Sequence, residues 1–305
     1  MVKVVSGWVL MLVGAFLLTA ALLMWFVVPG MAQRTPKNVD TNTYLSGHAQ
    51  KLNVHTGKVE DVPVTVWNNN AVDANRSTND VVLFVSKTCA NVDRNNPPKC
   101  LKKSDGRLIS NEVDVFAADR YTGLAAPDQA KYGATAHTGL VNKFPFNTQR
   151  KSYPMWDSVL QKSVTASFAG TAEIDGLSTY RFIVRVPRTK AEIAQNTEGT
   201  YQMDKTIWVE PKTGAIINQT QHEVRKLPDG TTAINMHIAF TKATEASFVK
   251  DAKANLDQLD LLTSTGPIVA CALGVLALIG GALLTFVFGR RSGAGTSDRE
   301  LVTTS

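Results

Sequence analysis

Two long apolar segments flank the middle of the chain. No charged residue occurs from Val4 to Gln33, and none occurs from Leu261 to Gly289. A bilayer core about 30 Å thick is crossed by roughly 20 apolar helical residues, so each segment is long enough to span it. We therefore predict one transmembrane helix at each end and a folded domain between them.

Between these segments, apolar and polar residues alternate over several short runs, which is typical of antiparallel strands with one buried face. Asp175 and Gly176 separate two such runs and predict a tight hairpin. Residues 210–214 include Pro211 and Gly214, which favour a second turn. The alternating apolar positions are Val62, Val64 and Val66; Tyr180, Phe182, Val184 and Val186; and Ile234, Met236, Ile238 and Phe240.

One segment has helical spacing instead. Phe248, Ala252, Leu256 and Leu259 recur every three or four residues with charged residues between them, which predicts an amphipathic helix. This helix either packs on the sheet or lies at the membrane surface, and we favour a stalk continuous with the second span. The predicted fold class is an α+β membrane protein, with two terminal transmembrane helices flanking a mainly antiparallel-β extracytoplasmic domain. Its parts are an N-terminal transmembrane helix at 1–33, the β-rich domain at 34–243, the amphipathic juxtamembrane helix at 244–262, a C-terminal transmembrane helix at 263–289 and a cytoplasmic tail at 290–305.

The residues that flank the spans predict their orientation. Arg290 and Arg291 follow the second span, and basic residues favour the cytoplasmic side, so two spans place both termini in the cytoplasm. Arg34, on the outer flank of the first span, opposes this assignment. A signal peptide has an apolar core of about 7–15 residues. The first segment is longer, which favours an uncleaved anchor and leaves cleavage as the alternative.

The cysteines indicate the compartment. Cys89 and Cys100 lie in a polar loop rich in Pro and Asn. A zinc site needs further Cys or His ligands at short spacing, and none accompanies them. A loop-closing disulfide is the better interpretation, and it indicates an oxidising compartment. Cys271, within the second apolar segment, is interpreted as a packing residue.

Small residues recur at heptad spacing in both predicted spans. Small side chains let helix backbones approach closely in lipid. We therefore predict that the two helices pack on each other or on a partner's helices; the alternative is that Gly and Ala are simply common in membrane helices. The helix-packing candidates are Gly7, Gly14, Ala21, Gly274 and Gly281.

The sequence offers little catalytic chemistry. It has no metalloprotease, nucleophile-elbow or nucleotide-binding motif, and its net charge of +6 includes no dense basic run. We therefore expect no enzymatic activity, no cofactor, no metal and no nucleic-acid partner. Asp119 and Arg120 form either a functional pair or an ion pair or turn cap, and we favour the second interpretation. The histidines are scattered without metal-ligand spacing, at His48, His55, His137, His222 and His237.

An aromatic cluster interspersed with prolines is the most unusual local pattern. Pro145 and Pro154 make a continuous ladder strand unfavourable, so we expect the rings on an irregular segment. They either plug the open end of the sheet or line an apolar cleft for an acyl chain. The candidate ligand-binding residues are Phe144, Phe146, Tyr153 and Trp156.

Five groups of motifs follow one another through the middle of the chain. They are Asp-Arg-Tyr-Thr-Gly from position 119, Phe-Pro-Phe-Asn-Thr from 144, Tyr-Pro-Met-Trp-Asp from 153, Gly-Leu at 176 with Tyr-Arg-Phe at 180, and Trp-Val-Glu-Pro-Lys-Thr-Gly from 208. Together with the two terminal spans, this series resembles an actinobacterial family of two-pass envelope proteins described as PorA-type porins. The resemblance covers most of the chain and implies a fold class and a compartment, but little mechanism.

Two apolar helices and an outward domain provide neither a closed lipid-facing barrel nor a polar path across a bilayer, so the porin description conflicts with the sequence. We expect a non-enzymatic envelope protein whose outward domain binds or passes on membrane lipid or another hydrophobic ligand. Its layout is similar to that of class B scavenger receptors, whose ectodomain carries a lipid tunnel, an analogy of layout alone. The alternatives are an accessory or scaffold subunit that joins other envelope membrane proteins, and a pore-forming protein.

Overall fold

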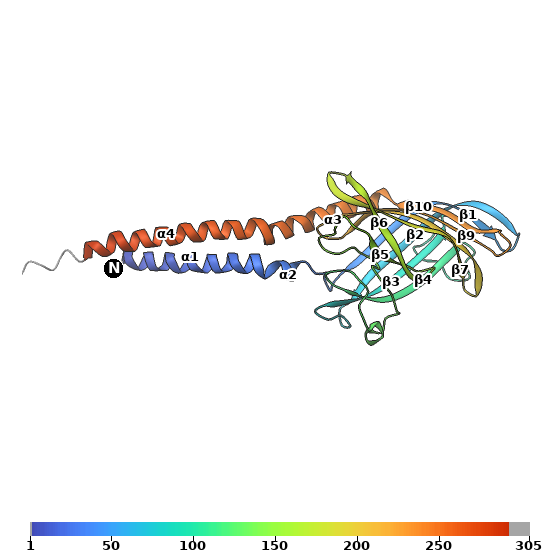
Figure 1. Cartoon of the computed structure of the whole chain (residues 1–305). Coiled ribbons are helices and arrows are strands. Elements are labelled where there is room, and N and C mark those ends of the chain that lie inside the picture. Colours follow the sequence, from blue (N-terminus) through green and yellow to red (C-terminus); the bar gives the residue numbers. More distant parts are fainter. Residues whose placement is uncertain (1, 293–305) are drawn as a thin grey trace, which may run out of the picture. The chain divides into compact units, whose positions relative to one another are not determined.

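The computed structural model describes the backbone of residues 2–292 and the side chains of residues 5–287. The chain divides into two compact units, traced in Figure 1. The two ends, up to Gln33 and from Asp257, belong to a helical unit, and Arg34–Leu256 form a β-rich unit. The predicted cytoplasmic tail at 290–305 lies outside the described residues, apart from the helical backbone at 290–292.

The helical unit contains α1 (Val2–Phe26), the short α2 (Val28–Ala32) and α4 (Gly266–Ser292). A π-helical turn, η2 (Leu261–Thr265), connects α4 to α3 (Lys242–Asp260) with no nonhelical residue between them. Within the described residues, two helical segments are long and apolar enough to cross a membrane. The first, Val5–Phe26, lies within the predicted span at 1–33. The second, Lys242–Val287, includes most of the predicted span at 263–289 and extends back through α3.

Small residues form the contact between α1 and α4. Gly7, Gly14 and Ala21 are buried on α1, and Gly274 and Gly281 are buried on α4. A Cβ added to Gly14 would lie 2.8 Å from the carbonyl oxygen of Gly274, so the backbones touch directly. The large apolar side chains on the other faces are exposed. Close backbone contact with outward apolar side chains is the arrangement expected of helices that associate in lipid.

The β-rich unit is a single antiparallel sheet of ten strands that curves into a half-barrel (Figure 1). The strand order is β4-β3-β2-β1-β10-β9-β8-β7-β6-β5. The first and last strands therefore pair at the centre, from Leu45 opposite Phe240 to Lys51 opposite Ile234. The strands are β1 (Asp40–Asn53), β2 (Lys58–Asp73), β3 (Val81–Val92), β4 (Leu108–Asp119), β5 (Tyr153–Asp157), β6 (Lys162–Ile174), β7 (Leu177–Ala194), β8 (Thr197–Val209), β9 (Ile216–Lys226) and β10 (Thr232–Phe240).

Both turns expected from the sequence are confirmed. Asp175 and Gly176 join β6 to β7 with φ values of 46° and 75°, a left-handed conformation that glycine adopts without strain. Glu210 organises the turn between β8 and β9, because its carboxylate accepts backbone hydrogen bonds from Lys212 at 2.8 Å and Thr213 at 2.7 Å.

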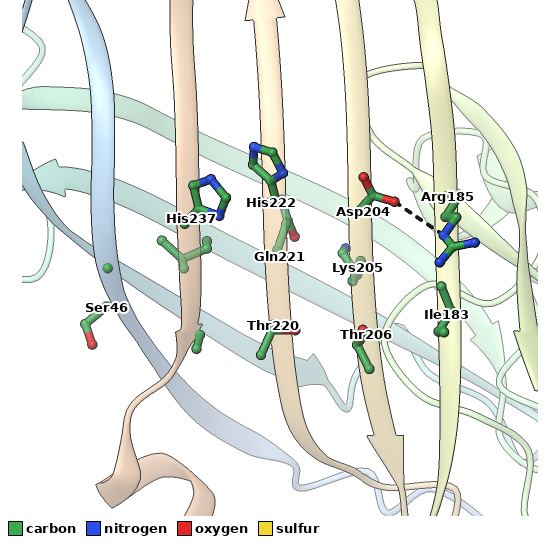
Figure 2. Close-up of a pocket in the computed structure, with 13 residues that line it drawn as sticks. Ser46, Ile183, Arg185, Asp204, Lys205, Thr206, Thr220, Gln221, His222 and His237 are labelled. Atoms are coloured by element: carbon green, nitrogen blue, oxygen red, sulfur yellow. Dashed lines mark ion pairs between the residues drawn. The ribbon is translucent and has the colours of Figure 1, made fainter. Parts of the chain in front are cut away.

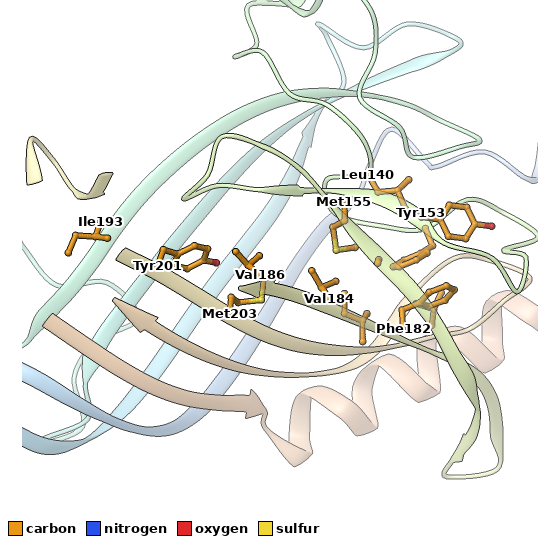
Figure 3. Close-up of a cluster of buried hydrophobic side chains, with 13 residues drawn as sticks. Leu140, Tyr153, Met155, Phe182, Val184, Val186, Ile193, Tyr201 and Met203 are labelled. Atoms are coloured by element: carbon orange, nitrogen blue, oxygen red, sulfur yellow. The ribbon is translucent and has the colours of Figure 1, made fainter. Parts of the chain in front are cut away.

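Over its central strands the sheet has an apolar inner face and a polar outer face, because successive side chains of a strand point to opposite faces. At β3 and β4 both faces are apolar and buried, with Val82, Phe84, Phe116 and Ala118 in one cluster and Val81, Leu83, Ala117 and Ala126 in the other. Arg185, Asp204 and His222 lie on the polar outer face (Figure 2). We call the other face the inner face, because residues of β5 pack there against residues of β8. Its first apolar cluster (Figure 3) contains Leu140, Phe144, Tyr153, Met155, Ala166, Phe182, Val184, Val186, Ile193, Tyr201, Met203, Ile207 and Val209. The second contains Leu45, Ala49, Val62, Val64, Val66, Ala90, Val92, Ile234, Met236 and Ile238.

The two edges of the half-barrel are joined by a narrow seam. In the connection from β4 to β5, isolated β-bridges pair Ala118 with Ala125, Leu124 with Leu140, and Leu140 with Met155. Both backbone groups of Leu140 bond to β5. Its N–H donates to the Pro154 carbonyl at 2.8 Å, and its carbonyl accepts a hydrogen bond from the backbone N–H of Trp156 at 2.7 Å. Every neighbouring pair of strands in the sheet has a longer ladder than these single bridges.

Helix α3 packs on the outer face of the sheet. Val249 and Ala252 are buried against Leu177 of β7 and Ile217 of β9. Lys253 also donates to the carbonyl of Asp175 at 2.7 Å. The sequence predicted a helix over 244–262 and favoured a stalk. The structure combines sheet packing with unbroken helical conformation into η2, and the helix begins at Lys242.

Cys89 of β3 and Cys100 of the following loop form a disulfide, with their Cα atoms 5.4 Å apart. The bridge links the strand to the β3–β4 connection, which contains no regular secondary structure around Cys100. Cys271 is free and half-buried in α4. The disulfide therefore restrains this loop together with Asn91, whose side-chain amide donates hydrogen bonds to the carbonyls of Pro98 and Lys99.

We predict that Gly274→Leu loosens the α1–α4 pair by about 1–3 kcal/mol, the usual cost of overpacking a tight contact. Ala272→Leu, on the exposed side of the same helix, is the matched control. Loss of helical circular dichroism with increasing SDS measures both. Equal midpoints for the two variants would contradict the proposed contact.

We predict that Cys89→Ser with Cys100→Ser lowers the free energy of unfolding by about 3 kcal/mol, because the disulfide closes a short loop in the unfolded chain. Urea unfolding of the full-length protein measures the change. Cys271→Ser is the control, since this thiol is unpaired. A double variant as stable as the wild type would show that the bridge does not form in the protein.

Candidate functional site

The four aromatic residues predicted as a ligand site lie in three different surroundings. Phe144 and Tyr153 belong to the inner-face cluster, with ring centroids 5.5 Å apart. Phe146 stacks instead on Tyr121 at 6.0 Å. Trp156, on the other side of β5, contacts the ring of His137 at 4.6 Å. The structure thus brings two of the predicted residues together in a packed core and separates the other two from them.

The expectation of an irregular segment is wrong for Tyr153 and Trp156, which lie in strand β5. The strand tolerates Pro154 because β5 is an edge strand, paired through a ladder with β6 alone, and proline is accommodated at sheet edges. Phe144 and Phe146 do lie on an irregular segment, as predicted.

A polar cluster on the inner face was not foreseen from the sequence. Asp157 and Glu223 are each 5% exposed. Tyr201 donates a hydrogen bond to Asp157 at 3.0 Å, and Arg225 donates to Glu223 at 2.6 Å. Burial lowers the pKa of Lys205, which lies on the same face, although Asp157 and Glu223 act against that shift. The half-barrel therefore contains a set of ionisable groups among its apolar side chains.

The sequence pattern behind this cluster can be recognised only when the pairing register of β9 is known. Residues at positions 219, 221, 223 and 225 of β9 are all polar and all face inward beside β8. A strand that is polar on both faces looks like an exposed strand in the sequence. Only the pairing of β9 with β8 and β10 places it at the centre of the sheet.

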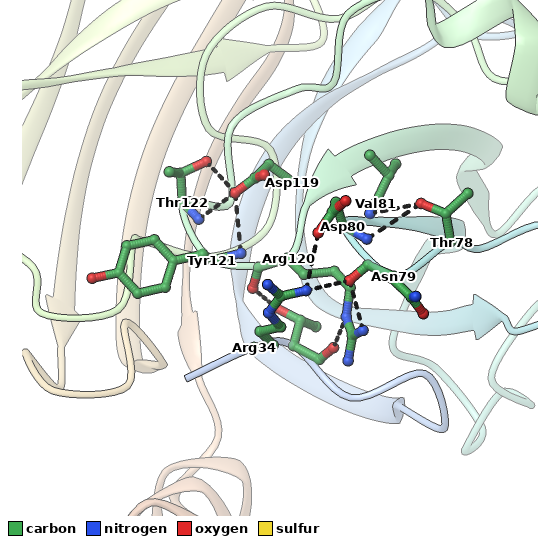
Figure 4. Close-up of polar contacts among 10 residues, drawn as sticks. Arg34, Thr78, Asn79, Asp80, Val81, Asp119, Arg120, Tyr121 and Thr122 are labelled. Atoms are coloured by element: carbon green, nitrogen blue, oxygen red, sulfur yellow. Dashed lines mark hydrogen bonds and ion pairs between the residues drawn. The ribbon is translucent and has the colours of Figure 1, made fainter. Parts of the chain in front are cut away.

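Asp119 and Arg120 act structurally at the end of β4 (Figure 4). One carboxylate oxygen of Asp119 accepts hydrogen bonds from the backbone of Tyr121 at 3.1 Å and of Thr122 at 2.7 Å, which caps the turn. Arg120 donates to the carbonyl of Thr35 at 2.8 Å. The favoured turn-cap interpretation is confirmed, and the arginine fixes the start of the β-rich unit to β4.

Lys143 lies beside this turn. Its Nζ is 3.7 Å from the centroid of the Phe146 ring and 3.4 Å from the hydroxyl of Thr35. Burial lowers the pKa of Lys143 to about 7, and the charge of Asp119 opposes the shift. The ring face also favours the charged amine, but loss of hydration outweighs it.

Metal-ligand groups are sparse in the part of the chain that the structure describes. No three His, Cys, Asp or Glu residues there are placed to hold a metal ion. His137 pairs with Asp114 at 2.8 Å. His222 and His237, separated in sequence, lie on neighbouring strands with their rings stacked at 3.7 Å. The structure thus brings together two of the five histidines that look scattered along the sequence.

Comparison with known proteins agrees with the resemblance seen in the sequence. A family model described as Porin PorA matches residues 6–283. A Porin PorA of Corynebacterium resistens is 22% identical over an alignment of 408 residues, which covers 93% of this chain and 97% of that protein. A Porin PorA of Corynebacterium amycolatum is 23% identical over 111 residues, which covers 34% of this chain and 29% of that protein. The family match includes the β-rich unit and most of both long apolar helices.

We predict that stability rises with pH through the titration of Lys143. Its pKa is about 7 in the folded protein and 10.5 in an ordinary lysine. Between these values the unfolded state binds more protons, so the free energy of unfolding increases as pH rises from 7 to 10.5.

Lys143→Met should remove this component of the pH slope. We expect the variant to be more stable than the wild type at pH 6, with the difference shrinking toward pH 10 in urea unfolding. Lys102→Met, at an exposed position, is the control. Parallel pH curves for wild type and Lys143→Met would contradict the prediction.

Proposed function

We propose that this chain, which belongs to the Porin PorA family, is a membrane-anchored envelope protein. Its half-barrel binds a hydrophobic ligand such as a lipid acyl chain. The observation that carries the proposal is the polarity of the sheet. Its inner face holds two apolar clusters, whereas its outer face is polar over the central strands β7, β8, β9 and β10. Apolar surfaces with a few placed polar groups are typical of sites for small hydrophobic ligands.

The inner face is closed by side-chain packing, so a ligand needs a way in. Phe144, Phe182 and Val209 in the first cluster are 0% exposed. On our proposal the half-barrel opens at the seam, because single bridges at Leu124, Leu140 and Met155 hold its edges, whereas full ladders hold the strands elsewhere. The long β4–β5 connection is then the element that moves.

The pore that the relatives' name suggests is the second candidate. A barrel that crosses a bilayer with strands has apolar side chains outside and polar ones inside. This sheet has the reverse polarity. The exposed side chains of α1 and α4 are largely apolar, and no Asp, Glu, Lys, Arg or His occurs from Val4 to Gln33 or from Leu261 to Gly289. The helix pair therefore offers no polar path. These observations favour ligand binding over conduction.

We further propose that the β-rich unit lies outside the cytoplasm and both termini inside it. The Cys89–Cys100 disulfide supports an oxidising compartment. Arg290 and Arg291, after the second span, support a cytoplasmic C-terminus. A role as a scaffold subunit of an envelope complex shares this topology and differs only in needing no ligand.

The seam gives a direct test. Leu124 and Leu140 are bridge partners, so Leu124→Cys with Leu140→Cys allows the seam to be locked by oxidation and released by reduction. Full-length protein in detergent is incubated with palmitate, and native mass spectrometry counts bound palmitate. We expect one adduct in the wild type and in the reduced variant, and its loss in the variant oxidised before loading.

Wild type treated with the same oxidant and reductant controls for the Cys89–Cys100 bridge. Palmitate bound equally to locked and released protein, or none bound to the wild type, would refute the proposal. Purified wild type is also examined in a planar bilayer. Stepwise conductance there, without palmitate binding, would establish the pore instead.

A further inference from the structure

A groove with a volume of about 530 Å³ crosses the outer face of the sheet (Figure 2). It runs over β7, β8, β9, β10 and β1, away from the apolar clusters of the inner face. Its volume lies within the range of about 300–1,000 Å³ that is usual for small-molecule sites. The groove is therefore large enough to hold a ligand of its own.

Strand register aligns two rows of side chains along the groove. One row consists of His237, His222, Asp204 and Arg185, each opposite the next on the neighbouring strand. The other row carries the hydroxyls of Ser46, Thr220 and Thr206, together with the apolar side chains of Ala239 and Ile183. Residues between the rows, such as Gln221, turn their side chains to the inner face, so the main chain forms the floor.

The groove offers hydrogen-bonding groups that the protein leaves available. The hydroxyls of Ser46, Thr206 and Thr220 have no hydrogen bond to the described residues. Arg185 contacts Asp204 through Nε at 3.6 Å, and its side chain is 75% exposed. A guanidinium held by one nitrogen has further donors for a ligand.

The charges in the groove cancel. Asp204 and Arg185 form an ion pair. Partial burial and the neighbouring His222 lower the pKa of His237, which favours its neutral imidazole. The two stacked rings lie 3.7 Å apart at an interplanar angle of 13°, and two cations at that distance would repel each other. The site thus presents donors and acceptors with no net charge.

We propose that this groove binds a neutral, polyhydroxylated ligand, an oligosaccharide. Each sugar hydroxyl both donates and accepts, which matches the threonine hydroxyls and the Asp204–Arg185 pair. The apolar side chains of Ala239 and Ile183 are interrupted by hydroxyls and charged groups, a mixture that suits the polar edges and C–H faces of a sugar better than an acyl chain. The cancelled charge does not select an anion or a cation. A linear glycan can lie across the strands along both rows. This site is separate from the inner face and does not depend on the proposed lipid binding.

The proposal is tested with full-length protein in lipid nanodiscs and three neutral trisaccharides, namely cellotriose, mannotriose and galactotriose. Saturation-transfer NMR detects binding, and trigalacturonate serves as the anionic probe. We expect transfer to at least one neutral trisaccharide and weaker transfer to trigalacturonate. The ring-proton resonances of His222 and His237 should shift during the same titration.

Thr206→Val with Thr220→Val keeps the side-chain shape and removes two hydroxyls. We expect affinity to fall about tenfold, the loss expected for two neutral hydrogen bonds. Thr200→Val, on the same strand and face but outside the groove, should bind like the wild type. Absence of transfer to all neutral trisaccharides, preference for trigalacturonate, or unchanged affinity in the double variant would overturn the proposal.

Discussion

The two faces of the ten-stranded sheet differ in polarity, and burial of the apolar face holds the β-rich unit together. Along β7 the buried residues Phe182, Val184 and Val186 alternate with less buried ones, and the same period runs through β1, β2 and β10. Transfer of such side chains out of water is the dominant favourable contribution to folding. It also fixes which surface meets water. Because the outer face is polar over the central strands and its apolar residues elsewhere are covered, the sheet is suited to water. The two apolar helices are the parts suited to lipid.

This polarity explains how far the sequence predicts the fold. Some features are encoded locally and can be recognised without knowledge of the tertiary fold. They are the two-residue period of the strands, the Asp175–Gly176 turn and the small residues of α1 and α4. The pairing of β1 with β10 is different, because it joins strands from opposite ends of the domain. No short-range pattern encodes it. The seam at Leu140 depends on that closure and was equally invisible.

The candidate sites were predictable only in part, for the same reason. Aromatic residues stand out in a sequence, so Phe144 and Tyr153 were found, although their neighbours in space were not. Lys205 and Glu223 look like solvated residues until the register turns them inward. His222 and His237 become a stacked pair only through the β9–β10 ladder. In each case the sequence showed the residue type, but the residue's partner in space depended on strand pairing and could not be predicted.

The buried polar cluster bears on how the half-barrel could open. Asp157 on β5 and Tyr201 on β8 are joined across the inner face at 3.0 Å, so their hydrogen bond adds to the bridges of the seam in keeping the edges together. Buried ionisable groups gain hydration when they become exposed, whereas apolar side chains lose free energy of burial. Rehydration of Asp157, Glu223 and Lys205 therefore offsets part of the cost of parting the seam. An inner face built of apolar residues alone would be harder to open. The polar cluster is therefore consistent with a half-barrel that is closed without ligand and that opens along the seam.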